Sequence, residues 1–96
     1  MTLRPTDRAG ALAAIEAELA ESKAASLGRA GAGVERTLAA LTAHGDGPDR
    51  DTLLKAAREA VWGLFVQREV MGQRDHSAVI AHYGVPAEVL RGLGSR

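Results

Sequence analysis

The sequence predicts an all-α fold. Helix-forming residues dominate its 96 positions, and no segment alternates apolar and polar residues for long enough to form a strand. Apolar residues instead recur three or four positions apart, and clusters of Gly, Pro and Asp separate these stretches. We expect a single helical domain over 1–96, with a disordered N-terminus at 1–6, a helix over about 7–43, a loop at 44–51, a helix over about 48–71, and short helices over about 76–82 and 86–92.

The first predicted helix carries one apolar stripe. At about 100° per residue its members fall within roughly 140° of arc, so the stripe keeps its phase throughout. Constant phase favours one long helix over two. Three glycines oppose this reading, because each costs about 0.8–1 kcal/mol relative to Ala in a helix interior. A bend near Gly28–Gly33, or another element crossing close to these small residues, therefore stays open. The stripe consists of Leu12, Ile15, Leu19, Leu27, Ala30, Val34, Leu38 and Leu41.

The length of this helix predicts a partner. A continuous helix over 7–43 is about 55 Å long at 1.5 Å per residue. A compact chain of this size has a radius of gyration near 12–13 Å and hence a diameter of roughly 30–35 Å. The helix should overhang its own domain and expose part of its stripe. A second copy of the chain would cover that stripe, so we expect an intertwined helical dimer.

The run from His44 to Asp51 is the clearest break in the pattern, with Gly45 suited to the end of the first helix. Asp46, Asp49 or Asp51 can cap the helix that follows. Two apolar faces of that second helix predict a central, buried helix contacted on two sides. Gly72 ends it. One face carries Leu53, Leu54, Ala57, Val61, Leu64 and Met71 with Phe65 at its edge, and the other carries Trp62, Val66 and Val70.

The last part of the chain predicts a short helical hairpin. Asp75 can cap a helix that Gly84 ends, and Pro86 suits the first turn of the last helix. Asp75–Leu93 also reads like a helix-turn-helix with Gly84 at its turn. Its second helix would present Pro86, Ala87, Glu88, Arg91 and Gly92, which is a poor set for phosphates or base edges. We favour the simpler interpretation, a hairpin that packs against the central helix.

Charge and composition exclude several classes of protein. Lys plus Arg and Asp plus Glu each number 12, and no basic patch or tail is present, so a nucleic-acid partner is not expected. The chain has no cysteine, which excludes disulfides and argues against a small secreted scaffold. The longest apolar run, 60–66, is far shorter than the ~20 residues that span a bilayer. Glu16 and Glu18 interrupt the N-terminal alanines, so no signal peptide is expected. We expect a cytoplasmic protein without a membrane partner.

Arg68 is the most unusual residue of the pattern, because it lies inside the apolar stripe of the second helix, between the directions of Leu64 and Met71. A buried charge needs a paired and hydrogen-bonded partner. Glu16 falls inside the apolar arc of the first helix and is one candidate partner, within or between chains. A structural ion pair or a snorkelling stem is the favoured interpretation of Arg68, and an anion site is the alternative.

Arg58 and Trp62 are four residues apart on one helix face, where the guanidinium can stack on the indole. Together with Phe65 they form a candidate interface site. The histidines do not share metal-ligand spacing, since His76 and His82 point to opposite sides of a helix and His44 lies in the loop. No serine or glycine run has the context of a nucleophile or a phosphate loop. We expect no catalytic residue, no metal and no cofactor.

Three segments carry a resemblance to a known family. They are the run Ala60-Val-Trp-Gly-Leu-Phe-Val-Gln-Arg-Glu, the run His82-Tyr-Gly-Val-Pro-Ala-Glu-Val-Leu, and the segment Leu27-Gly-Arg-Ala-Gly. In these the chain resembles a family of small, uncharacterised helical proteins of proteobacteria, a domain of unknown function. The shared motifs concern packing rather than chemistry. The resemblance implies a helical fold over most of the chain and no known activity or functional residue.

The function expected from the sequence is that of a small homo-oligomeric interaction or structural protein without catalytic activity. The alternative is a DNA-associated regulator that uses the hairpin Asp75–Leu93.

Overall fold

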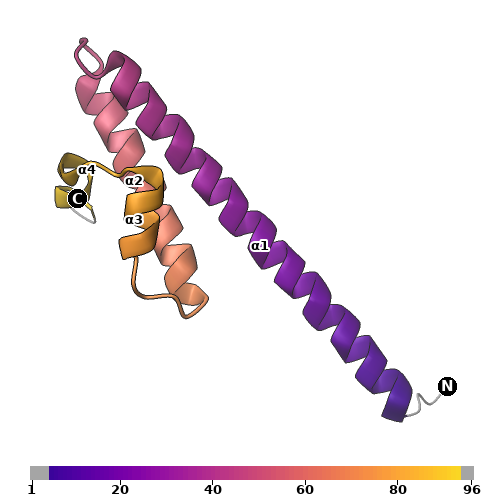
Figure 1. Cartoon of the computed structure of the whole chain (residues 1–96). Coiled ribbons are helices and arrows are strands. Elements are labelled where there is room, and N and C mark those ends of the chain that lie inside the picture. The colour runs from indigo at the N-terminus through magenta and orange to yellow at the C-terminus, as the bar shows by residue number, and fades with distance from the viewer. Residues whose placement is uncertain (1–4, 94–96) are drawn as a thin grey trace.

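Four helices make up the structure, a computed structural model that describes residues 5–93. They are α1 (Pro5–His44), α2 (Arg50–Val70), α3 (Ser77–Tyr83) and α4 (Ala87–Arg91). Figure 1 shows α1 as one long rod, with α2 folded back beside its C-terminal half and the two short helices resting on α2. The described range 5–93 contains no strand. The predicted all-α class, the long first helix and the short later helices are confirmed.

α1 runs without a break through Gly28–Gly33. Alanine, the strongest helix former, is frequent on both sides of these glycines and offsets part of their cost. The helix begins at Pro5, a residue whose fixed φ suits a first helical position. Disorder at 1–6 is therefore wrong for Pro5 and Thr6, and residues 1–4 lie outside the described part of the chain.

Packing explains why position 31 is a glycine, which it does not for the other glycines within the helices. A Cβ added there would overlap the Tyr83 hydroxyl and lie 3.2 Å from its Cζ atom, whereas one added at Gly28 would meet nothing within 4 Å. α3 therefore brings its last side chain against α1 at a position where only glycine fits. The expectation that a small residue marks a close crossing applies to Gly31 and not to Gly28.

The core lies between the C-terminal half of α1 and one side of α2. Ser26 donates a hydrogen bond to Gln67 Oε1 at 3.0 Å, which fixes the register of the antiparallel pair near the end of α2. Because the two helices run in opposite directions, Val70 lies level with about residue 23 of α1. Buried apolar residues fill the contact: Val34, Leu38 and Leu41 from α1, Leu54, Ala57, Val61, Leu64 and Phe65 from α2, and Val85 and Val89 from the hairpin.

Two glycines with left-handed backbone angles shape the rest of the chain. Gly72 (φ 84°) follows the last turn of α2, and Gly84 (φ 63°) follows α3. After each of them a backbone N–H returns to the preceding helix, from Gln73 to the Arg68 carbonyl and from Val85 to the Ile80 carbonyl, both within 3.0 Å. These closures satisfy carbonyls that a helix end leaves free. They fold α3 and α4 back so that Val85 and Val89 complete the core.

α2 contacts both α1 and α4, as expected of a central helix, but the prediction that its second apolar face is covered is wrong. Trp62 is 44%, Val66 40% and Val70 79% exposed. The hairpin covers a different part of α2 and leaves this second face open. The helix also begins at Arg50 rather than at 48, because residues 45–49 form the turn after α1.

The described chain is elongated. Its principal extents are 65 × 25 × 22 Å and its radius of gyration is 18.6 Å, well above the roughly 12–13 Å of a compact chain of this length. The excess comes from the N-terminal half of α1, which projects beyond the other helices (Figure 1). Every residue from 7 to 25 is exposed. We call this segment the arm and the remainder of the described chain the head.

Candidate functional site

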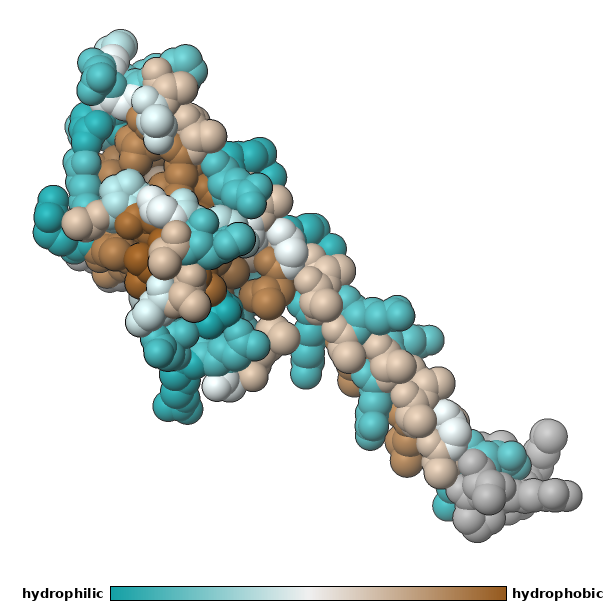
Figure 2. Space-filling view, in the orientation of Figure 1, coloured by the Kyte–Doolittle hydropathy of each residue, from teal (hydrophilic) through white to brown (hydrophobic). Residues whose placement is uncertain are grey.

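The arm presents large apolar side chains to solvent. Leu12 is 59%, Ile15 52% and Leu19 55% exposed. Their spacing places them on the face of α1 that carries Val34, Leu38 and Leu41 toward α2 further along the helix. In Figure 2 apolar side chains are visible along the arm, out to its N-terminal end. The stripe that forms the core of the head thus continues into the arm with nothing in the head to cover it.

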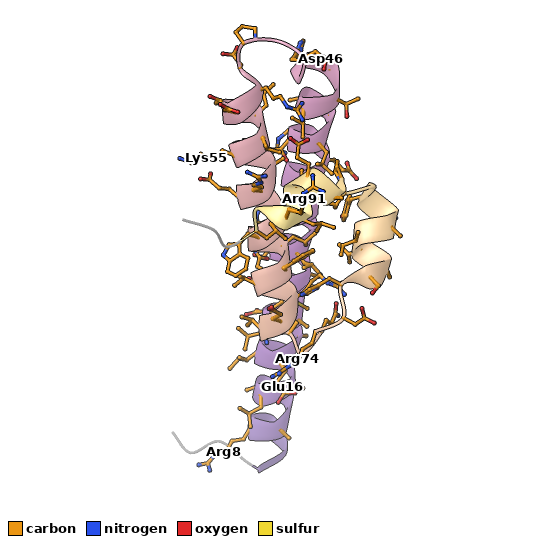
Figure 3. The ribbon with its side chains drawn as sticks, turned by 90° about the vertical axis from the view of Figure 1, so that its left-hand side faces the viewer. Arg8, Glu16, Asp46, Lys55, Arg74 and Arg91 are labelled. Carbon is orange, nitrogen blue, oxygen red and sulfur yellow. The ribbon has the colours of Figure 1, made fainter. Side chains whose placement is uncertain are left out.

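Charged residues flank this apolar stripe unevenly. Arg8 lies near the N-terminal tip, and Glu16 lies further toward the head (Figure 3). Glu18 and Glu21 follow Glu16, so three carboxylates occupy the half of the arm nearest the head. All of these residues are exposed. Glu16, predicted as a partner of Arg68, lies instead on the free arm.

Trp62, Val66 and Val70 form a second exposed apolar surface, which we call the α2 patch. They are spaced four residues apart and therefore share one side of α2. The patch ends level with about residue 23 of α1, where the arm begins. Val70 and the neighbouring Met71, which is also exposed, stand at this junction.

Arg68 is half-buried and bonded to the loop that follows α2. Its Nε donates to His76 Nδ1 at 3.2 Å, and its Nη2 donates to the Asp75 carbonyl at 3.0 Å. The prediction of a partnered guanidinium is met by an imidazole and a carbonyl. Glu16 is not its partner within the chain, and a pairing with Glu16 of a second copy stays a prediction. These bonds tie the start of α3 to the last turn of α2, which gives Arg68 a structural role.

His76 and Asp75 complete this small polar cluster. The His76 ring stacks on Phe65 with centroids 4.1 Å apart, and its Nε2 lies 3.8 Å from Glu69 Oε1. Asp75 Oδ1 accepts hydrogen bonds from the Ser77 hydroxyl at 2.7 Å and from the Ser77 backbone N–H at 3.0 Å. These two bonds, with smaller contributions from the charges of His76 and Arg68, lower the pKa of Asp75 below its ordinary value. Phe65 is therefore a core residue that positions His76.

Arg58 is directed at α4 rather than over Trp62, so the predicted stack is wrong. Its Nη2 donates to the Glu88 carbonyl at 2.9 Å, and its guanidinium packs so closely on Gly92 that an added Cβ would overlap it. Arg50 pairs with the Glu88 carboxylate. Glu88 and Gly92 were expected to face outward in the helix-turn-helix interpretation. They instead face α2, Glu88 from the five-residue helix α4 and Gly92 from the position that follows it.

Other kinds of site find no support in the described range. Residues 5–93 contain no group of three or more His, Cys, Asp or Glu side chains placed to hold a metal ion. Over the same range no helix is both long and apolar enough to cross a membrane. An open groove of about 310 Å³ lies beside α1 and α3, lined by Glu35, Thr42, His82 and Tyr83 among others, and Arg68 is not part of it.

Residues 2–96 match the model of one protein family, described as a family of unknown function (DUF6665). No curated protein and no solved structure matches the chain. The match confirms the resemblance to a domain of unknown function, and its proteobacterial origin stays a prediction.

Proposed function

We propose that this chain, which belongs to the family of unknown function DUF6665, is a homodimeric helical interaction module whose dimer contact is the exposed stripe of the arm. The observation that carries the proposal is the exposure of Leu12, Ile15 and Leu19 on the arm, the part of α1 that no other element of the head reaches. The proposal assigns no catalytic step to any residue.

The stripe is a specific contact surface rather than scattered surface hydrophobicity. Single exposed leucines are ordinary, but a continuous apolar stripe on a projecting helix marks a binding face. Fully burying a Leu or Ile side chain contributes about 1.5–3 kcal/mol. Because both copies contribute the same three positions, a two-fold contact gathers six of these side chains.

A second copy suits this surface because of its continuity with the core. The arm stripe has the same phase as the stripe that α2 covers, so it is patterned for another helix. Most helical stability in proteins comes from the packing of an amphipathic face, and residues 7–25 have no such packing against the head, so the arm is prone to fray from its tip. A partner that buries the stripe removes this instability. Each copy carries both halves of such a contact, as a two-fold dimer requires.

The proposal also places the protein in the bacterial cytoplasm. The lack of cysteine supports a reducing compartment. The bias toward Arg, Ala and Gly supports a GC-rich bacterial source, since Lys23 and Lys55 are the only lysines of the sequence.

Light scattering or sedimentation of the purified chain tests the proposal. Wild type should have twice the mass of one chain at high concentration and approach that of one chain on dilution. Ile15→Glu should be monomeric throughout, because it places a charge in the middle of the stripe. Ala17→Glu is the matched control: it adds the same charge on the opposite face of the arm and should leave the dimer intact.

A monomeric wild type at about 100 μM would overturn the proposal, because a specific interface should be populated there. So would equal behaviour of Ile15→Glu and Ala17→Glu. Trp62 gives an internal check, as its indole is the only one in the chain. Its emission should stay constant across the dissociation. A blue shift on association would assign the contact to the α2 patch instead of the arm.

A further inference from the structure

We infer that the two arms pair antiparallel, so that the tip of each arm reaches the exposed end of α2 in the other copy. This inference rests on the proposed function and adds the orientation of the partner and its second contact, at Val70 and Met71. Three features of the structure lead to it: where α2 lies on α1, how charge is distributed along the arm, and how long the arm is.

The position of α2 excludes a parallel partner. α2 covers the striped face of α1 from its far end down to about residue 23, as the Ser26–Gln67 bond fixes. α1 is straight, and the arm stripe lies on the same face (Figure 1). A parallel partner helix laid on the arm would continue along that face and run into α2. An antiparallel partner points its head away from this one, so only its arm occupies the free face.

The charges of the arm favour the same orientation. Glu16, Glu18, Glu21 and Lys23 give the half next to the head a net charge of −2, whereas Asp7 and Arg8 balance at the tip, where the positive end of the helix dipole lies. Parallel pairing would set each carboxylate beside the same carboxylate of the other copy. Antiparallel pairing sets this negative half beside the partner's tip, near its Arg8 and the positive end of its helix. The two negative halves are thereby kept apart.

The length of the arm sets the second contact. Residues 7–25 span about 28 Å at 1.5 Å per residue. If the stripe residues pair two by two, the two-fold axis passes between Leu12 and Ile15, and Pro5, where α1 begins, lies level with residue 22 of the partner, next to the end of its α2. Val70 is the most exposed large apolar residue of the head at 79%, and it stands at this junction beside Met71. The tip of the partner's arm would cover both side chains.

Disulfide trapping distinguishes the two orientations, and the lack of native cysteine makes the readout clean. In the antiparallel dimer Arg8 lies level with the partner's Leu19, while two copies of either residue are ~16 Å apart along the axis. A disulfide requires Cα atoms within about 7 Å. Mixed Arg8→Cys and Leu19→Cys chains should therefore form a cross-linked heterodimer on mild oxidation, and neither variant should cross-link with itself. Ala17→Cys, on the outer face of the arm, should cross-link with none of them.

Light scattering of the reduced variants keeps this test separate from that of the dimer itself. Reduced dimers in which Arg8→Cys and Leu19→Cys each cross-link with themselves would establish a parallel pair; the proposed function would stand and the antiparallel inference would be overturned. Reduced dimers that form no cross-link in any mixture would also overturn it, because the arms would not be in contact at these positions. Monomers at every concentration would remove the proposed function and the inference together.

Discussion

Gly28 and Gly31 lie three residues apart in α1, but alanine should affect the stability of the protein differently at the two positions. Gly28→Ala should raise the free energy of unfolding by about 0.5–1 kcal/mol, because alanine favours the helix and meets open space. The free energy of unfolding of Gly31→Ala should be about 1–3 kcal/mol lower than that of Gly28→Ala, since the new methyl group overlaps the Tyr83 hydroxyl. Urea denaturation measures both. Tyr83→Phe should restore much of the loss at Gly31, and an equal gain at both glycines would contradict the packing.

Asp75 makes the stability of the α2–α3 junction depend on pH. Its pKa is lowered from 3.8 in the folded chain by the two bonds from Ser77, so its carboxylate stabilises the fold above that value. The contribution is lost as the pH falls through the lowered pKa. Asp75→Ala should therefore have a lower melting temperature than wild type at pH 7. The gap between the two melting temperatures should close as the pH drops below about 4. Asp46→Ala, in the exposed turn after α1, is the control; a gap for Asp75→Ala that persists in acid would contradict this role.

At the scale of residues, the sequence predicted that Arg68 needs a partner, but it did not identify that partner. A cation inside an apolar stripe must be compensated. The compensation comes from His76 and the Asp75 carbonyl, which reach Arg68 only because Gly72 turns the chain back with a left-handed φ. That reversal depends on backbone angles, whereas the assignment to Glu16 rested on shared helix phase alone.

Arg58 fixes one element, α4, to another, α2. Arg58→Ala should lower the free energy of unfolding by about 1–2 kcal/mol, because the Glu88 carbonyl loses its donor and Gly92 its packing partner. Hydrogen exchange should show faster exchange of the α4 amides while the α1–α2 core keeps its protection. Arg91→Ala, an exposed residue of the same helix, should change neither quantity. Unaltered exchange in Arg58→Ala would show that Val89 and the Arg50–Glu88 pair hold α4 without Arg58.

At the scale of elements, periodicity predicted the helices well and their surroundings less well. Constant stripe phase predicted that α1 is continuous, and it is. The second face of α2 was expected to be buried, yet Trp62 and Val66 remain exposed. Periodicity shows that a face is apolar; it does not show which neighbour covers it. The outward direction expected for Glu88 was wrong for a related reason, because its ion pair with Arg50 joins residues far apart in the sequence.

At the scale of the whole molecule, one comparison of lengths predicted the shape. A helix longer than the diameter of a compact chain must project, and α1 projects as a solvent-exposed arm with Leu12, Ile15 and Leu19 uncovered. The residues of the candidate contact could be predicted from the sequence because they depend on local spacing. Their orientation against a second copy could not, because it depends on where α2 ends on α1.

Hydrogen exchange across a dilution series tests the central claim most directly, since it reports on the arm amides and the head amides separately. If a second copy covers the arm, exchange over 7–25 should slow markedly as protein concentration rises through the dissociation constant, while exchange over residues 50–66 of α2 stays unchanged. Ile15→Glu should exchange its arm rapidly at every concentration. Arm exchange in wild type that is equally fast at all concentrations would contradict the claim that a second copy covers this stripe.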